Sequence, residues 1–252
     1  RQALENWNVE EVYDEKMQKR LKQQFYYQYP YRDLEGKKLK YTVSELKKRT
    51  YLAEEAGELP YEDEPVVPLI PRFLQGEEEI TGAPRGTAYH RVMELLDFTK
   101  EYDLEGTEAA IEKMCESGRI AGEMAESVRP KDILTFIHTT SGQRMKQAAE
   151  ENKLWKEQPF VLGIPARDIY PEMTEEDETM LVQGIIDVCF EEDGELVVLD
   201  YKTDKIWSEQ KLLEKYQSQL EYYARALEQI TGKKVREKII YSFTMQKEIA
   251  WK

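Results

Sequence analysis

Alternating apolar and polar positions in the second half of the chain predict three consecutive β-strands. We expect these strands over Leu154–Ile164, Met180–Phe190 and Glu195–Lys202. The dipeptide Asp193-Gly194 separates the last two and favours a two-residue hairpin turn, because both positions tolerate positive φ. Counting back from that turn places Asp187 directly opposite Asp200 on one face of the hairpin.

Apolar residues spaced three and four apart predict helices through much of the remaining chain. The expected helices cover about Trp7–Gln28, a segment starting at the capping box Thr42-Val-Ser-Glu45, Thr87–Phe98, 104–127, 130–150 and Glu209–Ile230. One more strand is expected over Val235–Phe243, and Pro60–Pro71 has the proline content of an extended connector. This order of helices and strands predicts an α/β (α+β) fold.

The two facing aspartates are the strongest chemical signal in the sequence. Carboxylates side by side repel each other unless a cation lies between them, and a divalent metal would meet that need. An acidic chain also contains many aspartate pairs that only face water. The neighbours on the same face are apolar, however (Ile185, Cys189, Leu196 and Val198), so we expect the aspartates to lie in a partly enclosed site.

Composition limits the classes of function without choosing one. The 252 residues allow one large domain, or one domain with an appended segment, and Arg1 as first residue suggests a piece of a longer protein. A net charge of −14 argues against a broad nucleic-acid surface but allows a local cleft. No apolar run is long enough for a bilayer helix, so no membrane role is expected. Two cysteines are too few for a four-cysteine iron–sulfur cluster and suggest a reducing compartment such as the cytoplasm.

A few other residues could join the aspartates. His90 has Glu94 at i+4 to orient its imidazole, although an isolated helix histidine is more often a surface or capping residue. Lys202 could stabilise charge on a phosphate or form a salt bridge to an aspartate. Gln219 and Tyr223 share a helix face that could either pack on the sheet or contact nucleic acid. The chain contains no Walker A loop, no nucleophile elbow and no Rossmann glycine pattern.

These residues, taken in order, resemble the RecB-family branch of the PD-(D/E)XK nucleases. The matching motifs are Gly86-x-x-x-His90, Gly184-x-x-Asp187, Asp200-Tyr-Lys202 and Gln219-x-x-x-Tyr223. The resemblance implies a restriction-endonuclease-like core, with a central mixed sheet flanked by helices and an N-terminal helical extension. Residues 1–40 would link to preceding helicase domains, and residues 41–252 would form the nuclease domain.

The resemblance also implies roles for individual residues. Lys202, Asp187 and Asp200 would be catalytic. The ligands of Mg²⁺, or of Mn²⁺ as a substitute, would be His90, Asp187, Asp200 and the backbone carbonyl of Tyr201. Gln219 and Tyr223 would bind the DNA strand, and Glu94 and Glu157 would be accessory residues.

Details around Arg85–Glu94 and Thr42–Lys47 look like helicase–nuclease subunits that process bacterial double-strand breaks. This implies an exonuclease that hydrolyses DNA strands delivered by helicase domains, with ATP used only in those domains and with a partner subunit in the same complex. Two alternatives stay open. The acidic surface and the tyrosine-rich N-terminal segment also fit a non-catalytic domain that docks the partner subunit, and a standalone CRISPR-associated or junction-resolving nuclease is a third possibility.

Overall fold

A computed structural model describes residues 14–27, 38–47, 85–170 and 179–252. The chain divides into two compact units, Arg1–Leu39 and Lys40–Lys252. The expected connector Pro60–Pro71 lies outside the described residues. Within the described ranges, no helix is long and apolar enough to cross a membrane.

The described part of the first unit is dominated by helix α2 (Glu15–Phe25), which confirms the middle of the helix expected from about Trp7. Asp14 caps its N-terminus by accepting hydrogen bonds from the backbone N–H groups of Lys16 and Met17. None of the helix side chains is buried, and Phe25 is 82% exposed. The rest of the expected helix lies outside the described residues.

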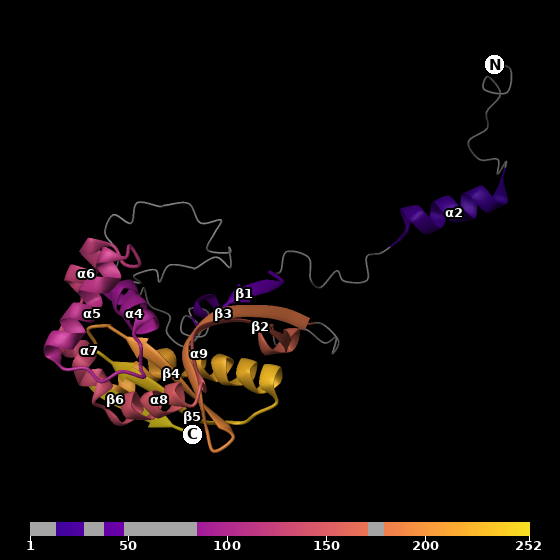
Figure 1. The fold of residues 1–252 in the computed structure, drawn as a ribbon. Helices are drawn as coiled ribbons and strands as arrows, with labels where there is room; N and C mark the ends of the chain where they lie inside the picture. The colour runs from indigo at the N-terminus through magenta and orange to yellow at the C-terminus, as the bar shows by residue number, and fades with distance from the viewer. Residues whose placement is uncertain (1–13, 28–37, 48–84, 171–178) are drawn as a thin grey trace. The chain divides into compact units, whose positions relative to one another are not determined.

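The second unit is built on a six-stranded mixed sheet (Figure 1). Its strands are β1 (Lys40–Thr42), β2 (Leu154–Pro165), β3 (Thr179–Glu192), β4 (Glu195–Lys202), β5 (Val235–Ser242) and β6 (Lys247–Trp251). The order is β1-β3-β4-β5-β6, with β2 also paired to β3. β1 is parallel to β3 and β4 is parallel to β5, while the other pairs are antiparallel. The four strands expected from the sequence are confirmed, and the short strands β1 and β6 were not anticipated.

Helices flank the sheet, as expected. They are α4 (Arg85–Leu95), α5 (Leu104–Glu116), α6 (Gly122–Ser127), α7 (Pro130–Ile137), α8 (Thr140–Glu150) and α9 (Glu209–Thr231), with a short 3-10 turn, η3 (Ala166–Asp168). The single helices expected over 104–127 and 130–150 were wrong. Gly118, at φ +67°, breaks the first, and Thr139 caps a new helix by accepting the N–H of Gly142, which breaks the second. Gly232 ends α9 in the left-handed conformation, as predicted.

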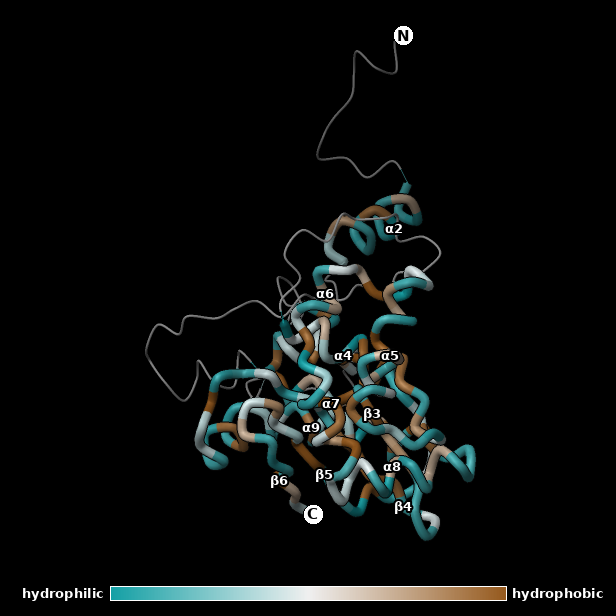
Figure 2. The backbone as a smooth tube through the Cα atoms, turned by 60° about the vertical axis from the view of Figure 1, so that its left-hand side comes forward, coloured by the Kyte–Doolittle hydropathy of each residue, from teal (hydrophilic) through white to brown (hydrophobic). Residues whose placement is uncertain are grey.

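One large core joins the helices α4 to α8 to a single face of the sheet (Figure 1). The side chains in this core from the sheet, and from the residue directly after β5, are Val188, Phe190, Val197, Leu199, Tyr201, Ile239, Tyr241 and Phe243. They alternate with the side chains that face α9, as a pleated strand requires. Both faces of the sheet are covered at the end of β5, where the adjacent residues Ile239 and Ile240 are both buried, and Figure 2 shows a brown stretch of the tube beside the β5 label. The candidate site residues of β3 and β4, which are Asp187, Asp200 and Lys202, therefore lie between the helical layers.

The hairpin between β3 and β4 has the predicted register. Glu192 pairs with Glu195 across the turn, and the pairing continues to Val188 and Leu199. Asp193 and Gly194 adopt φ of 51° and 84°, the positive values that a type I′ turn needs. The dipeptide Asp193-Gly194 was therefore sufficient to predict the register of this hairpin.

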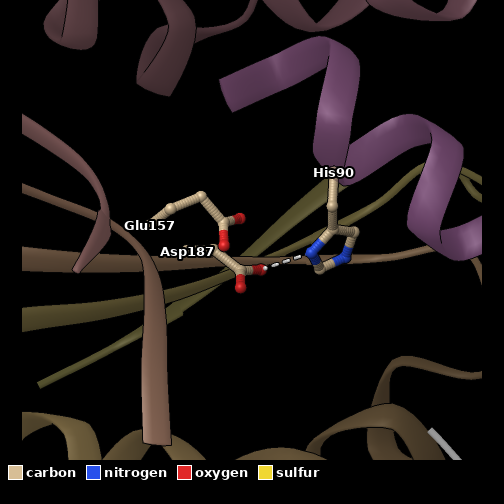
Figure 3. A group of neighbouring side chains, drawn as sticks. All are labelled: His90, Glu157 and Asp187. Atoms are coloured by element: carbon tan, nitrogen blue, oxygen red, sulfur yellow. Dashed lines mark ion pairs between the residues drawn. The ribbon is translucent and has the colours of Figure 1, made fainter. Parts of the chain in front are cut away.

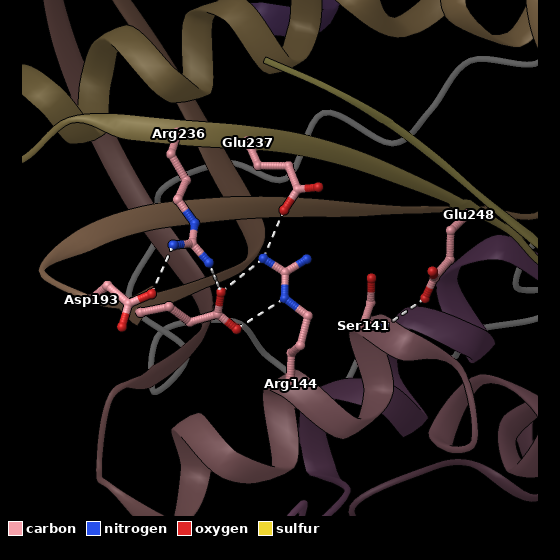
Figure 4. A network of polar contacts seen from close by, with 7 residues as sticks. Ser141, Arg144, Asp193, Arg236, Glu237 and Glu248 are labelled. Carbon is pink, nitrogen blue, oxygen red and sulfur yellow. Dashed lines mark hydrogen bonds and ion pairs between the residues drawn. The ribbon is translucent and has the colours of Figure 1, made fainter.

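Two arginines fix the tip of this hairpin (Figure 4). Arg144 of α8 donates two hydrogen bonds to Glu192, of 2.9 and 2.8 Å, and lies 2.7 Å from Glu237 of β5. Arg236 of β5 donates to Asp193 at 3.1 Å and also to Glu192. The bidentate geometry fixes both distance and orientation. The turn is thereby tied to both α8 and β5, which secures the register on which the aspartates depend.

The sheet has a gap on one edge of β3. β2 pairs along this strand from Thr179 to Phe190 and so occupies the other edge. β1 pairs only with residues 181–183 and β4 only with residues 188–192, so these two share the remaining edge. Among the described residues, positions 184–187 therefore have no strand partner on that edge. Asp187 lies at the end of the gap, where β4 begins to diverge.

Gly184 lies inside this gap, at a position where a larger side chain would not fit. A Cβ atom at this position would lie 2.8 Å from the ring of Phe160 and 3.1 Å from Val43. The Phe160 ring packs edge-on against Tyr223 of α9, with their centroids 5.7 Å apart. Gly184 thus lets β2, β3 and α9 approach closely beside Asp187.

We expect Gly184→Ala to destabilise the fold by about 1–3 kcal/mol, since Phe160 and Tyr223 must shift to admit the methyl group. Urea denaturation would measure the loss. Gly122→Ala is the matched control, because a Cβ there meets nothing within 4 Å. Equal free energies of unfolding for the two variants would contradict this account of Gly184.

Candidate active site

Three acidic residues lie at the same level of three neighbouring strands. The pairs Lys156–Val188 and Gln158–Ile186 place Glu157 of β2 opposite Asp187 of β3. The hairpin register places Asp200 of β4 opposite Asp187 on the other side. Asp187 is 7% exposed and Asp200 is fully buried. Buried carboxylates in such a row repel one another strongly unless cationic groups compensate.

The strand pairing is interrupted at this level on both sides of Asp187. Glu157 and Asp187 form no backbone pair, and Glu157 adopts a left-handed φ of 50°. Toward β4, the pairing ends at Val188 and Leu199, and the N–H of Tyr201 donates to the side-chain Oδ2 of Asp187 at 2.9 Å. Left-handed backbone in a strand costs free energy and is concentrated at functional sites. Regular backbone pairing is therefore absent at the level where the acidic residues meet.

His90 extends from α4 to the level of Asp187 and contacts groups of both β3 and β4. Its Nδ1 lies 3.4 Å from Oδ2 of Asp187, and its Nε2 lies 2.9 Å from the carbonyl oxygen of Tyr201. Figure 3 shows the imidazole and the carboxylates of Glu157 and Asp187 directed toward one another. The motif residues His90, Asp187 and Tyr201 are therefore brought together as the sequence suggested.

The position of α4 depends on close contacts at its start. A Cβ atom on Gly86 would lie 3.2 Å from Oγ1 of Thr203, so glycine lets the helix approach the end of β4. Tyr89 donates a 2.6 Å hydrogen bond to the buried Asp132 of α7. Together these contacts hold His90 at the sheet. Asp132 drew no attention in the sequence, because an acid in the first turn of a helix is common.

Asp200 and Lys202 form a buried ion pair on the α9 side of the sheet. Asp200 Oδ2 lies 2.9 Å from Nζ of Lys202, and Gln219 Nε2 donates to Asp200 Oδ1 at 3.3 Å. Gln219 also donates to the hydroxyl of Tyr223 at 2.7 Å. Gln219 and Tyr223 are only 5% and 4% exposed, so the structure places them beneath Asp200 and away from the surface. Their DNA-binding role stays a prediction.

Glu94 does not orient the imidazole of His90. Its carboxylate pairs with Arg91 one turn earlier on α4, while both imidazole nitrogens of His90 are taken by Asp187 and Tyr201. The orienting group is therefore a backbone carbonyl from β4, which helix spacing cannot reveal.

The residues present fit a hard divalent cation. One ligand atom each from His90, Glu157 and Asp187 lie within 4.8 Å of one another. Oδ2 of the buried Asp200 receives no well-aligned hydrogen bond from the described residues. Oxygen donors with a single imidazole suit Mg²⁺ or Mn²⁺ better than a soft metal. Glu157, expected only as an accessory residue, belongs to the compact set, whereas Asp200 lies outside it.

Burial and charge shift the pKa values of the site in opposite directions. Burial raises the pKa of Asp200 to about 7; the charge of Asp187 adds to the rise, and Lys202 only partly offsets it. Burial would lower the pKa of His90, but the carboxylate of Asp187 outweighs it and raises the value to about 9. For Asp187, burial is overcome by His90 and Lys202, so its pKa falls below the usual range. The site therefore favours protonated His90 and ionised Asp187.

Comparison with known proteins identifies the family. The sequence model of the PD-(D/E)XK nuclease superfamily matches residues 66–249. The chain belongs to this superfamily. The resemblance inferred from the four motifs and the expected nuclease fold are thereby confirmed.

Several similar proteins are named as ATP-dependent helicase/nuclease subunits. That of Acetivibrio thermocellus is 38% identical over 85% of this chain and 17% of its own length. The subunit of Clostridium kluyveri is 34% identical over 96% of this chain and 19% of its own length. The subunit of Lachnoclostridium phytofermentans is 35% identical over 73% of this chain and 16% of its own length. The chain thus spans less than a fifth of these relatives. A solved structure, the crystal structure of SSO0001, aligns with 65% of this chain and 73% of its own at 13% identity and a TM-score of 0.29.

We expect the protein stripped of divalent ions to lose stability as the pH rises from about 4 to 9. Asp200 and His90 have pKa values of about 7 and 9 in the fold, against ordinary values of 3.8 and 6.5. Both bind protons more tightly when folded, so their stabilisation is complete below the ordinary values and is lost as the pH rises through the folded values. The loss is measurable as a Tm that falls as the pH rises.

Asp200→Asn should remove the part of this fall near pH 7. Asp168→Asn, at a surface ion pair with Arg225, should leave it unchanged. A pH dependence in Asp200→Asn identical to that of the wild type would contradict the burial effect assigned to Asp200.

Proposed function

We propose that this chain is the nuclease domain of a bacterial helicase–nuclease that processes DNA double-strand breaks for recombinational repair. The proposal is supported most directly by the buried site that combines His90, Glu157, Asp187, Asp200 and Lys202 with the matched family. The names of the relatives, in which helicase and nuclease occur together, support the wider role.

The reaction would be hydrolysis of a DNA phosphodiester bond, in which a water oxygen bonds to phosphorus as the sugar oxygen leaves. We propose Mg²⁺, with Mn²⁺ as a substitute, held by His90, Glu157, Asp187 and Asp200 with the carbonyl of Tyr201. When bound, such an ion polarises the phosphate and lowers the pKa of water. The ammonium group of Lys202, 2.9 Å from Asp200, would stabilise the negative charge that develops on the phosphate oxygens.

Gln219 and Tyr223 would act from beneath the site. The Gln219 amide donates to Asp200 and to the Tyr223 hydroxyl, so the two side chains would fix the carboxylate in one orientation. Contact with the DNA strand, if these residues make it, would require their side chains to become exposed. In their buried positions, the main contribution of Gln219 and Tyr223 would be to hold the Asp200 carboxylate in place.

The substrate would be single strands unwound from double-stranded ends and degraded as an exonuclease. Helicase domains of the same polypeptide would deliver them, and ATP would be consumed only there. Residues 1–40 would connect those domains to the nuclease domain of residues 41–252. An AddB-type partner would complete the complex, which would work in the cytoplasm.

A second role is favoured by the exposed aromatic residues at the end of α2. Phe25, Tyr26 and Tyr27 are each at least two-thirds exposed. Such residues suit a docking contact with the partner protein or with the helicase domains. A purely scaffolding domain would need this contact and would not need the acids.

In the intact protein, Asp187→Ala and Lys202→Ala should each lower Mg²⁺-dependent cleavage of single-stranded DNA by about 100-fold or more. ATP-driven unwinding should be retained, because the altered residues lie outside the helicase domains. Product release from end-labelled DNA would measure the first activity, and strand separation the second.

Asp168→Ala is the control, since it also removes an aspartate carboxylate but from an exposed ion pair with Arg225, away from the site residues. It should retain most of the nuclease activity. Undiminished cleavage in Asp187→Ala would exclude the catalytic role and leave the scaffold role.

A further inference from the structure

The ammonium group of Lys202 has a second neighbour besides Asp200. Its Nζ lies 4.2 Å from the centre of the Tyr216 ring, which α9 places against the end of β4. The lysine side chain has four rotatable bonds, and the ion pair with Asp200 by itself fixes only the distance to that carboxylate. A cation over an aromatic ring gains an attraction that strengthens when both groups are removed from water. Lys202 and Tyr216 are 4% and 1% exposed, so that condition is met.

The ring of Tyr216 is itself fixed by a hydrogen bond. Its hydroxyl donates to Oδ2 of Asp204 at 2.7 Å, and Lys215 donates to Oδ1 of the same carboxylate at 2.6 Å. Burial would raise the pKa of Asp204, but the bonds from Lys215 and Tyr216 lower it below the usual range. Asp204 therefore acts as an ionised anchor two residues beyond Lys202.

A second buried lysine lies over the same ring. Nζ of Lys47, from the helical residues 43–47, is 4.1 Å from the ring centre, and this residue is 4% exposed. The helix begins at the predicted capping box, in which Glu45 N–H donates to Thr42 at 3.2 Å and Thr42 N–H donates to Glu45 at 2.9 Å. Three separate segments therefore converge on the ring of Tyr216.

A tyrosine that only filled space in the core would need none of these contacts. Leucine or phenylalanine could occupy its volume, and neither a bonded hydroxyl nor two ammonium groups over the ring would be required. Its burial also separates it from any DNA-binding surface. The geometry favours a role exerted on Lys202.

We propose that Tyr216 is a positioning residue for the catalytic lysine. The face of its ring holds the ammonium group of Lys202 beside Asp200, and the bond from its hydroxyl to Asp204 prevents the ring from turning. This inference rests on the proposed nuclease function. Without the ring, the ammonium group can adopt other rotamers, and a displacement of about 1 Å is enough to slow a positioned reaction substantially.

The test measures kcat and KM for single-stranded DNA in the intact protein, together with Mn²⁺ affinity by calorimetry without nucleotide. Tyr216→Leu should lower kcat about 10- to 100-fold, with KM and Mn²⁺ affinity changed less than about threefold. Tyr216→Phe keeps the ring and should recover most of the lost kcat. Asp204→Asn should give a smaller fall than Tyr216→Leu.

Tyr222→Leu is the matched control, because this half-buried tyrosine lies on the same helix and, within the described part of the chain, no hydrogen bond or ring contact joins it to a site residue. It should leave kcat within about threefold of the wild type. Loss of kcat and Mn²⁺ affinity in parallel in Tyr216→Leu would show a general structural role and overturn the proposal, as would an unchanged kcat. Should Tyr216→Leu fail to fold, a kcat in Tyr216→Phe and Asp204→Asn that both equal the wild type would also overturn it.

Lys202→Ala separates this inference from the function on which it rests. If Lys202→Ala cleaves DNA as the wild type does, the proposed function of Lys202 fails. If Lys202→Ala is inactive while Tyr216→Leu is fully active, only the role of Tyr216 fails.

Discussion

The burial of Asp187 and Asp200 side by side in a covered sheet is the constraint on which the site depends. Two such carboxylates could not both remain ionised without compensation. The compensation comes from His90 on one side and Lys202 on the other, each within 3.4 Å of an acid. The backbone contributes too, because the Tyr201 N–H bonds a side chain where a regular ladder would use a carbonyl.

The compensating groups come from different layers of the structure. His90 belongs to the helical layer that packs on one face of the sheet, while Gln219 and Tyr216 belong to α9 on the other face. They can meet because the edge of β3 has no strand partner in the described structure between β1 and β4. The tight packing of Gly184 against Phe160 lets the layers approach closely at this gap. The interruption of the sheet thus allows residues from the helices on both faces to contribute to one site.

The sequence was most informative where a local signal determines a long stretch of structure. Asp193-Gly194 fixed the hairpin register, and with it the level of Asp187 and Asp200. Thr42 and Glu45 fixed the start of a helix. The ordered motifs indicated the family, and the strands that carry them were found where expected.

The remaining features depend on contacts between distant segments. Nothing in the residues near Glu157 shows that β2 pairs beside β3 with this glutamate opposite Asp187. Strand β1 is three residues long and exists only because β3 offers an edge. The capping of α8 by Thr139 was hidden inside a continuous helical pattern. The pairing of Glu94 with Arg91 shows that correct helix spacing can still assign the wrong partner.

The spread of the site over two layers also governs when it can exist during folding. His90 precedes its partner Tyr201 by 111 residues, and the Gln219–Asp200 contact requires α9, which follows the hairpin in the chain. Contacts of such long sequence separation form late, after the loops that connect them have closed. A partly folded or truncated chain would therefore contain the separate acids without the assembled constellation. The architecture itself thus delays the appearance of the assembled site until the whole sheet and both of its helical layers are in place.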